Sequence, residues 1–133
     1  MIQPTKPIET GDQPRAFSSV RPLLHLEGLA AFVAGLAIYG AGGGDWLWVV
    51  PLLLLPDASM LGYLAGPAIG SHLYNLAHNW AVGLAVLGIG AWLPATPLVL
   101  AGAILVAHVG IDRLVGYGLK YPTHFRDTHL GRV

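Results

Sequence analysis

The sequence predicts an all-α membrane protein of four antiparallel transmembrane helices, and three observations support this prediction. Of the 133 residues, 54% are hydrophobic and only 11% are charged, whereas a soluble domain carries about 25% charged residues. Four long apolar stretches follow one another along the chain. Only a few residues connect each stretch to the next, so neighbouring helices should pack antiparallel.

Glycine, proline and charged residues mark the ends of the four predicted spans. The spans run over residues 23–41, 46–65, 68–92 and 98–120. Each is close to the roughly 20 residues that cross about 30 Å of hydrocarbon. Pro56 lies inside the second span, where we expect it to free a backbone carbonyl and to kink the helix. Glycines such as Gly28 with Gly35, and Gly83 with Gly88 and Gly90, should let helices approach closely.

The two polar ends of the chain should lie on the same side of the membrane. We expect residues 1–22 to form an extended, Pro-rich N-terminal tail and residues 121–133 a short C-terminal tail. Basic residues occur towards both ends of the chain. The turn after the first span (residues 42–45) and the turn after the third (residues 94–97) contain none. The positive-inside rule then predicts a bacterial inner-membrane protein with both termini in the cytoplasm. The opposite interface would be marked by three tryptophans, Trp46, Trp48 and Trp92.

Ionisable side chains from all four spans fall at one depth, in the cytoplasmic half of the bundle. At a rise of 1.5 Å per residue, five of them lie roughly 6–18 Å from the cytoplasmic ends. These five are Glu27, Asp57, His78, His108 and Asp112. A charge at mid-membrane costs at least about 2.5 kcal/mol, so we expect these groups to face inward and to be partnered. Other polar side chains would extend this network: Ser59, Tyr74, Asn75, Arg113 and Lys120.

This polar layer contains the ligand types of a divalent metal site. Two histidines and up to three carboxylates match the ligands of zinc, iron or manganese. We expect His78, His108 and Asp112 as ligands, with Asp57 or Glu27 as a fourth ligand or a general base. A metal with an open position activates water, which suggests hydrolysis of a lipid-like substrate. No compact motif such as H-E-x-x-H occurs.

The same residues also allow two readings without a metal. Arg113 or a protonated histidine would neutralise Asp112 in a buried polar network. A proton or ion carrier would instead use Glu27, Asp57 and Asp112. Ligation of haem or chlorophyll by His78 and His108 is disfavoured, because the nearby carboxylates make a poor apolar porphyrin pocket. If the site is an enzyme, Lys120 or Arg113 would bind an anion.

Three stretches of the chain resemble a family of small bacterial four-span membrane proteins that is catalogued only as a domain of unknown function. They read LLHLEGLAAF, LPDASMLGYLAGPAIGSHLYNLAHNWA and AHVGIDRLVGYGLKYPTHFRDTHLG. The resemblance runs from about Leu23 to Gly131, and its most specific parts coincide with the polar layer. It implies the four-span fold, and it supplies no reaction, substrate or cofactor.

Composition narrows the possible partners and functions. A formal net charge of zero argues against a nucleic-acid partner, and the lack of cysteine excludes disulfides and thiolate metal sites. The first functional hypothesis is an accessory subunit of a photosynthetic or respiratory membrane complex. Its helix faces and N-terminal tail would contact lipid and other membrane subunits. The alternatives are the metal-dependent hydrolase and the proton or ion carrier described above.

Overall fold

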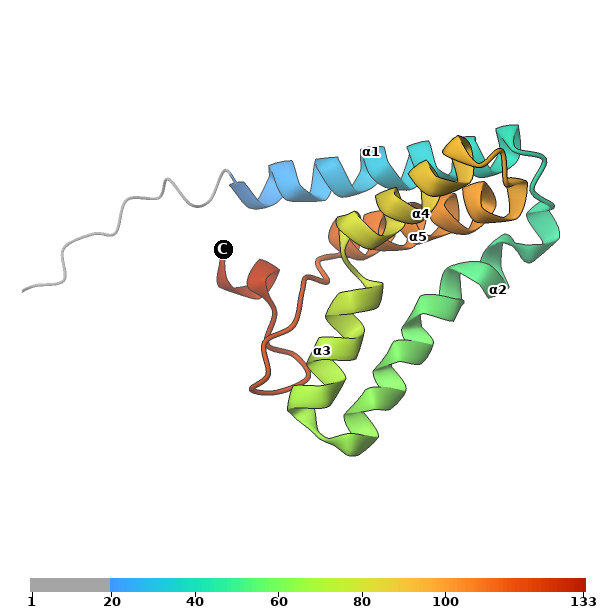
Figure 1. Cartoon of the computed structure of the whole chain (residues 1–133). Coiled ribbons are helices and arrows are strands. Elements are labelled where there is room, and N and C mark those ends of the chain that lie inside the picture. Colours follow the sequence, from blue (N-terminus) through green and yellow to red (C-terminus); the bar gives the residue numbers. More distant parts are fainter. Residues whose placement is uncertain (1–19) are drawn as a thin grey trace, which may run out of the picture.

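A computed structural model describes residues 20–133, and the regular structure of this part is helical apart from one isolated β-bridge between Lys120 and Thr128 (Figure 1). The elements in chain order are α1 (Val20–Ala41), η2 (Trp46–Trp48), α2 (Val49–Leu54), η3 (Leu55–Ala65), α3 (Pro67–Ala77), α4 (Trp80–Trp92), α5 (Thr96–Val115) and η4 (His129–Arg132). Here η denotes a 3₁₀-helix. The prediction of an all-helical chain is confirmed.

Helix α5 lies at the centre of the fold. Helices α1 and α4 both pack against it, whereas α3 packs mainly against η3 (Figure 1). The pair formed by η3 and α3 is inclined to the other helices, and the C-terminal segment runs alongside α3. Among residues 20–133, three stretches are long and apolar enough to cross a membrane: Val20–Ala41, Trp46–Ala65 and Thr96–Val115.

Close contact between α1 and α5 depends on two glycines of α1. A Cβ atom added at Gly28 would lie 2.6 Å from the backbone nitrogen of Leu114, and one at Gly35 would lie 2.7 Å from the carbonyl oxygen of Ala103. The two backbones therefore touch, as the sequence predicts for these glycines. Gly88 is different, because an added Cβ there would meet nothing within 4 Å.

The expectation that residues 68–92 form one continuous helix is wrong. Helix α3 ends at Ala77 and α4 begins at Trp80. Asn79 causes the break by acting as an N-cap: it adopts an extended conformation, and its side-chain oxygen accepts a hydrogen bond from the Val82 nitrogen. A hydropathy average over the whole stretch does not register such a cap, because most of the other residues between 68 and 92 are apolar.

Both ends of the predicted bundle also differ from expectation. Helix α1 begins at Val20, so residues 20–22 are helical, and the rest of the predicted tail lies outside the described residues. Helix α5 ends at Val115 rather than at residue 120, because Gly116 adopts a left-handed conformation with φ of 99°. The C-terminal residues fold back on the protein, where Leu130 is fully buried.

Candidate metal centre

Four side chains from three parts of the fold converge on one point. His78 Nε2 lies 3.3 Å from Asp57 Oδ1 and 3.8 Å from Asp112 Oδ2. His108 Nε2 lies 3.6 Å from the same oxygen of Asp57 and 3.8 Å from that of Asp112. Asp57 comes from η3, His78 from the end of α3, and the other two from α5. The polar layer that the sequence predicts is therefore partly assembled.

Three of these side chains are placed to hold one metal ion, because Asp57, His78 and His108 offer ligand atoms that all lie within 4.8 Å of one another. Neighbouring ligand atoms of a tetrahedral zinc site are about 3.3–3.4 Å apart. The four distances between histidine nitrogens and carboxylate oxygens are 3.3–3.8 Å. Three of them are too long for hydrogen bonds. A cation bound between these atoms would interact with both histidines and with the carboxylates at once.

The orientation of both imidazoles gives independent support. His78 Nδ1 lies 2.8 Å from the carbonyl oxygen of Tyr74, and His108 Nδ1 lies 2.5 Å from that of Leu53. A carbonyl oxygen only accepts, so each Nδ1 donates. A neutral ring then carries a lone pair on Nε2, the atom that faces the carboxylates. Metal-binding histidines are held in this way by a partner at the other nitrogen.

Pro56 explains why the Leu53 carbonyl is free to hold His108. In 3₁₀ winding, the nitrogen of each residue bonds the carbonyl three residues earlier. The nitrogen of residue 56 would bond Leu53, but proline carries no N–H. The freed carbonyl predicted for this proline therefore orients a candidate ligand.

Tyr74 contacts one carboxylate and one imidazole of the candidate centre. Its hydroxyl donates to Asp112 Oδ2 over 3.0 Å, and its ring stacks on the His78 ring with 3.7 Å between centroids. The ring of His108 lies edge-on to that of His78, at 4.7 Å. His78 is fully buried and His108 is 3% exposed. His108 Nε2 is itself buried and lacks a hydrogen-bond partner among residues 20–133. A bound metal ion would supply the missing partner.

A protein-family model, described as a domain of unknown function (DUF4260), matches residues 21–133. The chain belongs to the DUF4260 family. No curated protein and no solved structure matches it. The match covers all four converging residues and every helix except the first residue of α1, so the candidate centre lies within the DUF4260 domain.

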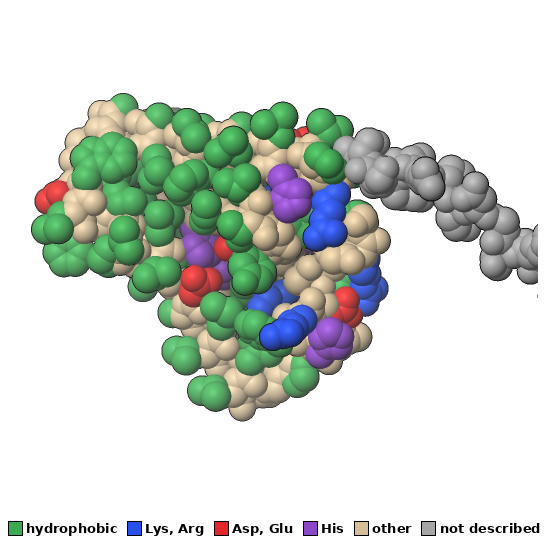
Figure 2. Space-filling view, turned by 180° about the vertical axis from the view of Figure 1, so that it is seen from behind, with side chains coloured by type: hydrophobic (Ala, Val, Ile, Leu, Met, Phe, Trp, Pro, Cys, Tyr) green, Lys and Arg blue, Asp and Glu red, His purple; other side chains and the backbone are tan. Residues whose placement is uncertain are grey.

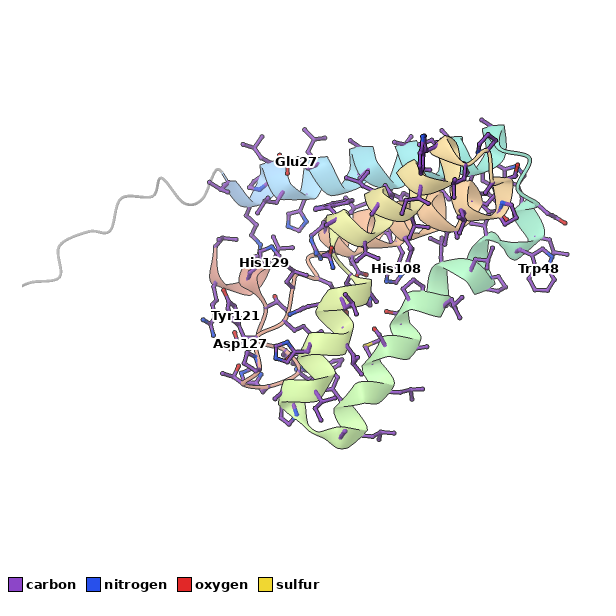
Figure 3. The ribbon with its side chains drawn as sticks, viewed as in Figure 1. Glu27, Trp48, His108, Tyr121, Asp127 and His129 are labelled. Atoms are coloured by element: carbon purple, nitrogen blue, oxygen red, sulfur yellow. The ribbon has the colours of Figure 1, made fainter. Side chains whose placement is uncertain are left out.

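Other predicted site residues of the DUF4260 domain have different positions. The expectation that Glu27 faces inward is wrong: it is exposed on α1, on the outside of the molecule (Figure 3). Ser59 Oγ is buried without a partner in the described part of the chain. Asn75 exchanges two hydrogen bonds with the backbone of Lys120. Arg113 donates to the backbone carbonyl oxygens of His78 and Tyr117.

Two cavities of the DUF4260 domain reach the centre from different sides. One, of about 510 Å³, is lined by both aspartates together with polar and aromatic side chains that include Tyr117, Lys120 and Phe125. The other, of about 280 Å³, is lined by both aspartates, His108 and apolar residues such as Leu54. On the face drawn in Figure 2, acidic, histidine and basic side chains gather between the group formed by α1, α4 and α5 and the pair formed by η3 and α3. Hydrophobic side chains cover much of the rest of this face.

Sequence reasoning did not identify the two carbonyls that orient the histidines. The Tyr74 carbonyl belongs to the last turn of α3 and has no signature of its own. The Leu53 carbonyl does have one, since Pro56 stands three residues later. That spacing identifies the carbonyl only when the winding is known to be 3₁₀.

Proposed function

We propose that this DUF4260 protein is a membrane-embedded hydrolase that depends on a divalent metal ion. One observation carries the proposal: the Nε2 atoms of His78 and His108 and one oxygen each of Asp57 and Asp112 converge at 3.3–3.8 Å, while both Nδ1 atoms bond backbone carbonyls. With neutral imidazoles these are four acceptor atoms, and a bound cation would relieve their mutual repulsion. Two imidazoles and two carboxylates suit zinc, iron or manganese.

We assign His78, His108 and Asp112 as the permanent ligands. Asp112 is held by the Tyr74 hydroxyl, and its side chain is 13% exposed, against 33% for Asp57. A bound metal would act as a Lewis acid that polarises water and the scissile group. Asp57 is the more exposed of the two carboxylates, and like Asp112 it lines both cavities. We therefore assign it as the general base, which takes a proton from water and returns it to the leaving group.

We further propose that the chain crosses the bacterial inner membrane four times with both termini in the cytoplasm, α3 and α4 together forming an interrupted third span. Trp48 lies at one end of the molecule and Tyr121 at the other (Figure 3), as expected for aromatic residues at two interfaces. A broken helix in a membrane is tolerated where other groups bond the freed backbone. At this break Arg113 donates to the carbonyl of His78.

Metal analysis of the full-length protein tests the proposed centre. The protein is purified in mild detergent after growth with zinc, iron and manganese, and bound metal is measured by elemental analysis. We expect about one ion per chain in the wild type and a large loss in His108→Ala and Asp112→Asn. His72→Ala is the matched control, because His72 is exposed on α3 and should leave the metal content unchanged. Wild-type protein without stoichiometric metal would contradict the proposal.

Hydrolysis itself needs a second measurement. The metal-loaded protein is assayed with chromogenic carboxylic and phosphate esters that carry acyl chains of different lengths. We expect turnover that a chelator abolishes and that Asp57→Asn lowers strongly. A metal-loaded protein that is inactive on every ester would leave the centre in place and remove the hydrolase. The accessory-subunit and ion-carrier hypotheses stay predictions, and an intact membrane complex isolated with this chain would favour the first of them.

A further inference from the structure

Lys120 is a buried cation beside the candidate centre. Its exposed fraction is 6%, and it lines the same cavity of about 510 Å³ as Asp57 and Asp112. Within residues 20–133, its ammonium makes no hydrogen bond and no ion pair. Its nearest neighbours are instead aromatic: Nζ lies 3.2 Å from the centroid of the Phe125 ring and 4.3 Å from that of Tyr74.

The fold holds this lysine in place from both sides. Asn75 Nδ2 donates to the Lys120 carbonyl over 2.8 Å, and the Lys120 nitrogen donates to Asn75 Oδ1 over 2.7 Å. An antiparallel bridge joins Lys120 to Thr128. A side chain on such a fixed backbone is preorganised, and preorganisation lowers the entropy that binding costs.

Neither of the nearby arginines offers a second buried cation with free donors in this cavity. Arg113 is used by two carbonyl oxygens, and Arg126 is exposed where it lines the cavity. The aromatic faces next to Lys120 attract its ammonium, but they accept no ordinary hydrogen bond. The carboxylates in the same cavity face the histidines. The three N–H donors of Lys120 therefore lack an acceptor within the described protein.

We propose that Lys120 binds a phosphate group of the substrate while the scissile bond lies at the metal centre. This inference rests on the proposed function, since it names the class of substrate for that site. A lysine ammonium binds a phosphate group as a compact point charge with three N–H donors. The phosphate is carried by a lipid headgroup or by a water-soluble ester, and the apolar cavity on the other side of the aspartates fits an alkyl chain in the first case.

Calorimetry with inorganic phosphate tests Lys120 directly. The probe is titrated into full-length protein in detergent, in metal-loaded and chelated samples. Lys120→Met keeps the length and removes the charge, Lys120→Arg keeps the charge, and Arg21→Met removes an exposed charge at the beginning of α1. We expect the Met variant at position 120 to bind phosphate at least about tenfold more weakly. The Arg variant should stay within a few-fold of wild type, and the Arg21 variant should equal it.

Equal phosphate affinity in wild type and Lys120→Met would overturn the inference. Metal content is measured in every sample, so failure of the metal centre is seen separately from failure of Lys120. Loss of phosphate binding in the chelated Met variant supports Lys120 even if the centre holds no metal. A lysophosphatidate and glycerol phosphate are then compared as probes. Tighter binding of the lipid identifies a headgroup as the source of the phosphate, and equal binding identifies a soluble ester.

Discussion

Arg113 ties the break between α3 and α4 to the end of α5. Its Nη2 donates to the carbonyl oxygen of His78 over 2.9 Å, and its Nη1 donates to that of Tyr117 over 2.7 Å. The arginine is 6% exposed. One side chain therefore fixes the backbone of a candidate ligand and the chain reversal that follows Gly116.

Replacement of this arginine by lysine should destabilise the protein. Lysine cannot present two donors in the same planar geometry, so Arg113→Lys leaves at least one buried carbonyl without its charged partner. Loss of a hydrogen bond to a charged group costs about 1.5–3 kcal/mol. We expect a corresponding loss in the free energy of unfolding in detergent, together with weaker metal binding. Arg126→Lys, at an exposed position, is the control; equal effects of the two substitutions would contradict this role.

The two aspartates should respond differently to the same substitution. Asp112→Asn removes an assigned ligand, so we expect the metal content to fall far below one ion per chain. Asp57→Asn removes the assigned base, so the metal should remain while turnover falls by about 10²-fold or more. Elemental analysis and activity are measured on the same preparations. Loss of metal in both variants would make Asp57 a ligand and would refute its assignment as the base.

Tyr74→Phe separates the hydroxyl of Tyr74 from its ring. The ring should still stack on His78, but the hydrogen bond to Asp112 is lost. Partners of metal ligands typically contribute about 10–100-fold to metal affinity. We therefore expect metal affinity, measured by competition with a chelator, to fall within that range while the helical content stays the same. Unchanged affinity would show that the hydroxyl does not support the site.

Gly28→Ala should loosen the contact between α1 and α5. The added methyl group would lie 2.6 Å from the Leu114 nitrogen, and backbone cannot yield as a side chain does. Overpacking of this kind costs typically about 1–3 kcal/mol, which thermal unfolding in detergent would detect. Gly88→Ala is the matched control, because its methyl group would meet nothing within 4 Å. A destabilising effect of the control as large as that of Gly28→Ala would rule out this explanation.

The pH dependence of stability should contain a contribution from His129. Burial lowers the pKa of His129 below its usual value, and the positive charge of Arg113 lowers it further. The folded protein therefore favours the neutral ring, whose Nδ1 accepts a hydrogen bond from the Leu119 nitrogen. The stabilisation is complete above about pH 6.5, the usual pKa of histidine, and is lost as pH falls towards the lowered pKa.

His129→Gln isolates this contribution, since titration of other groups affects both proteins alike. We expect the wild type to lose stability relative to the variant as pH falls from about 7 to 5. The measurement is denaturant unfolding in detergent at several pH values. A difference that stays constant over that range would show that His129 does not titrate differently on folding.

The sequence was sufficient to predict most of the candidate centre, because depth in a membrane can be counted. Helical rise puts Asp57, His78, His108 and Asp112 in one layer, and the structure brings these four together. Depth says nothing about rotation around the helix axis. Glu27 was misplaced for that reason: Gly28 faces α5, and its neighbour, about 100° around the helix, points elsewhere.

The break at Asn79 was missed for a different reason. A hydropathy average over some twenty residues smooths over a single capping residue, whereas the Gly66-Pro67 break was predicted because both residues oppose helix continuation. The polar run from Tyr74 to Asn79 was the available signal, since asparagine is a favoured N-cap. The early end of α5 had a similar signal in Gly116, because glycine is the residue that most often ends a helix in the left-handed conformation.

The 3₁₀ winding of η3 makes this eleven-residue segment longer than an α-helix of the same residues. A 3₁₀-helix rises about 2.0 Å per residue, so this segment extends over about 22 Å, whereas the same residues in α-helical winding would extend over about 16 Å. Relaxation to α-helical winding would shorten the segment and turn Asp57 about the helix axis, away from the two histidines. The winding of η3 therefore sets the position of the general base: relaxation of this segment would carry Asp57 out of the site, while the three assigned ligands on α3 and α5 stayed in place.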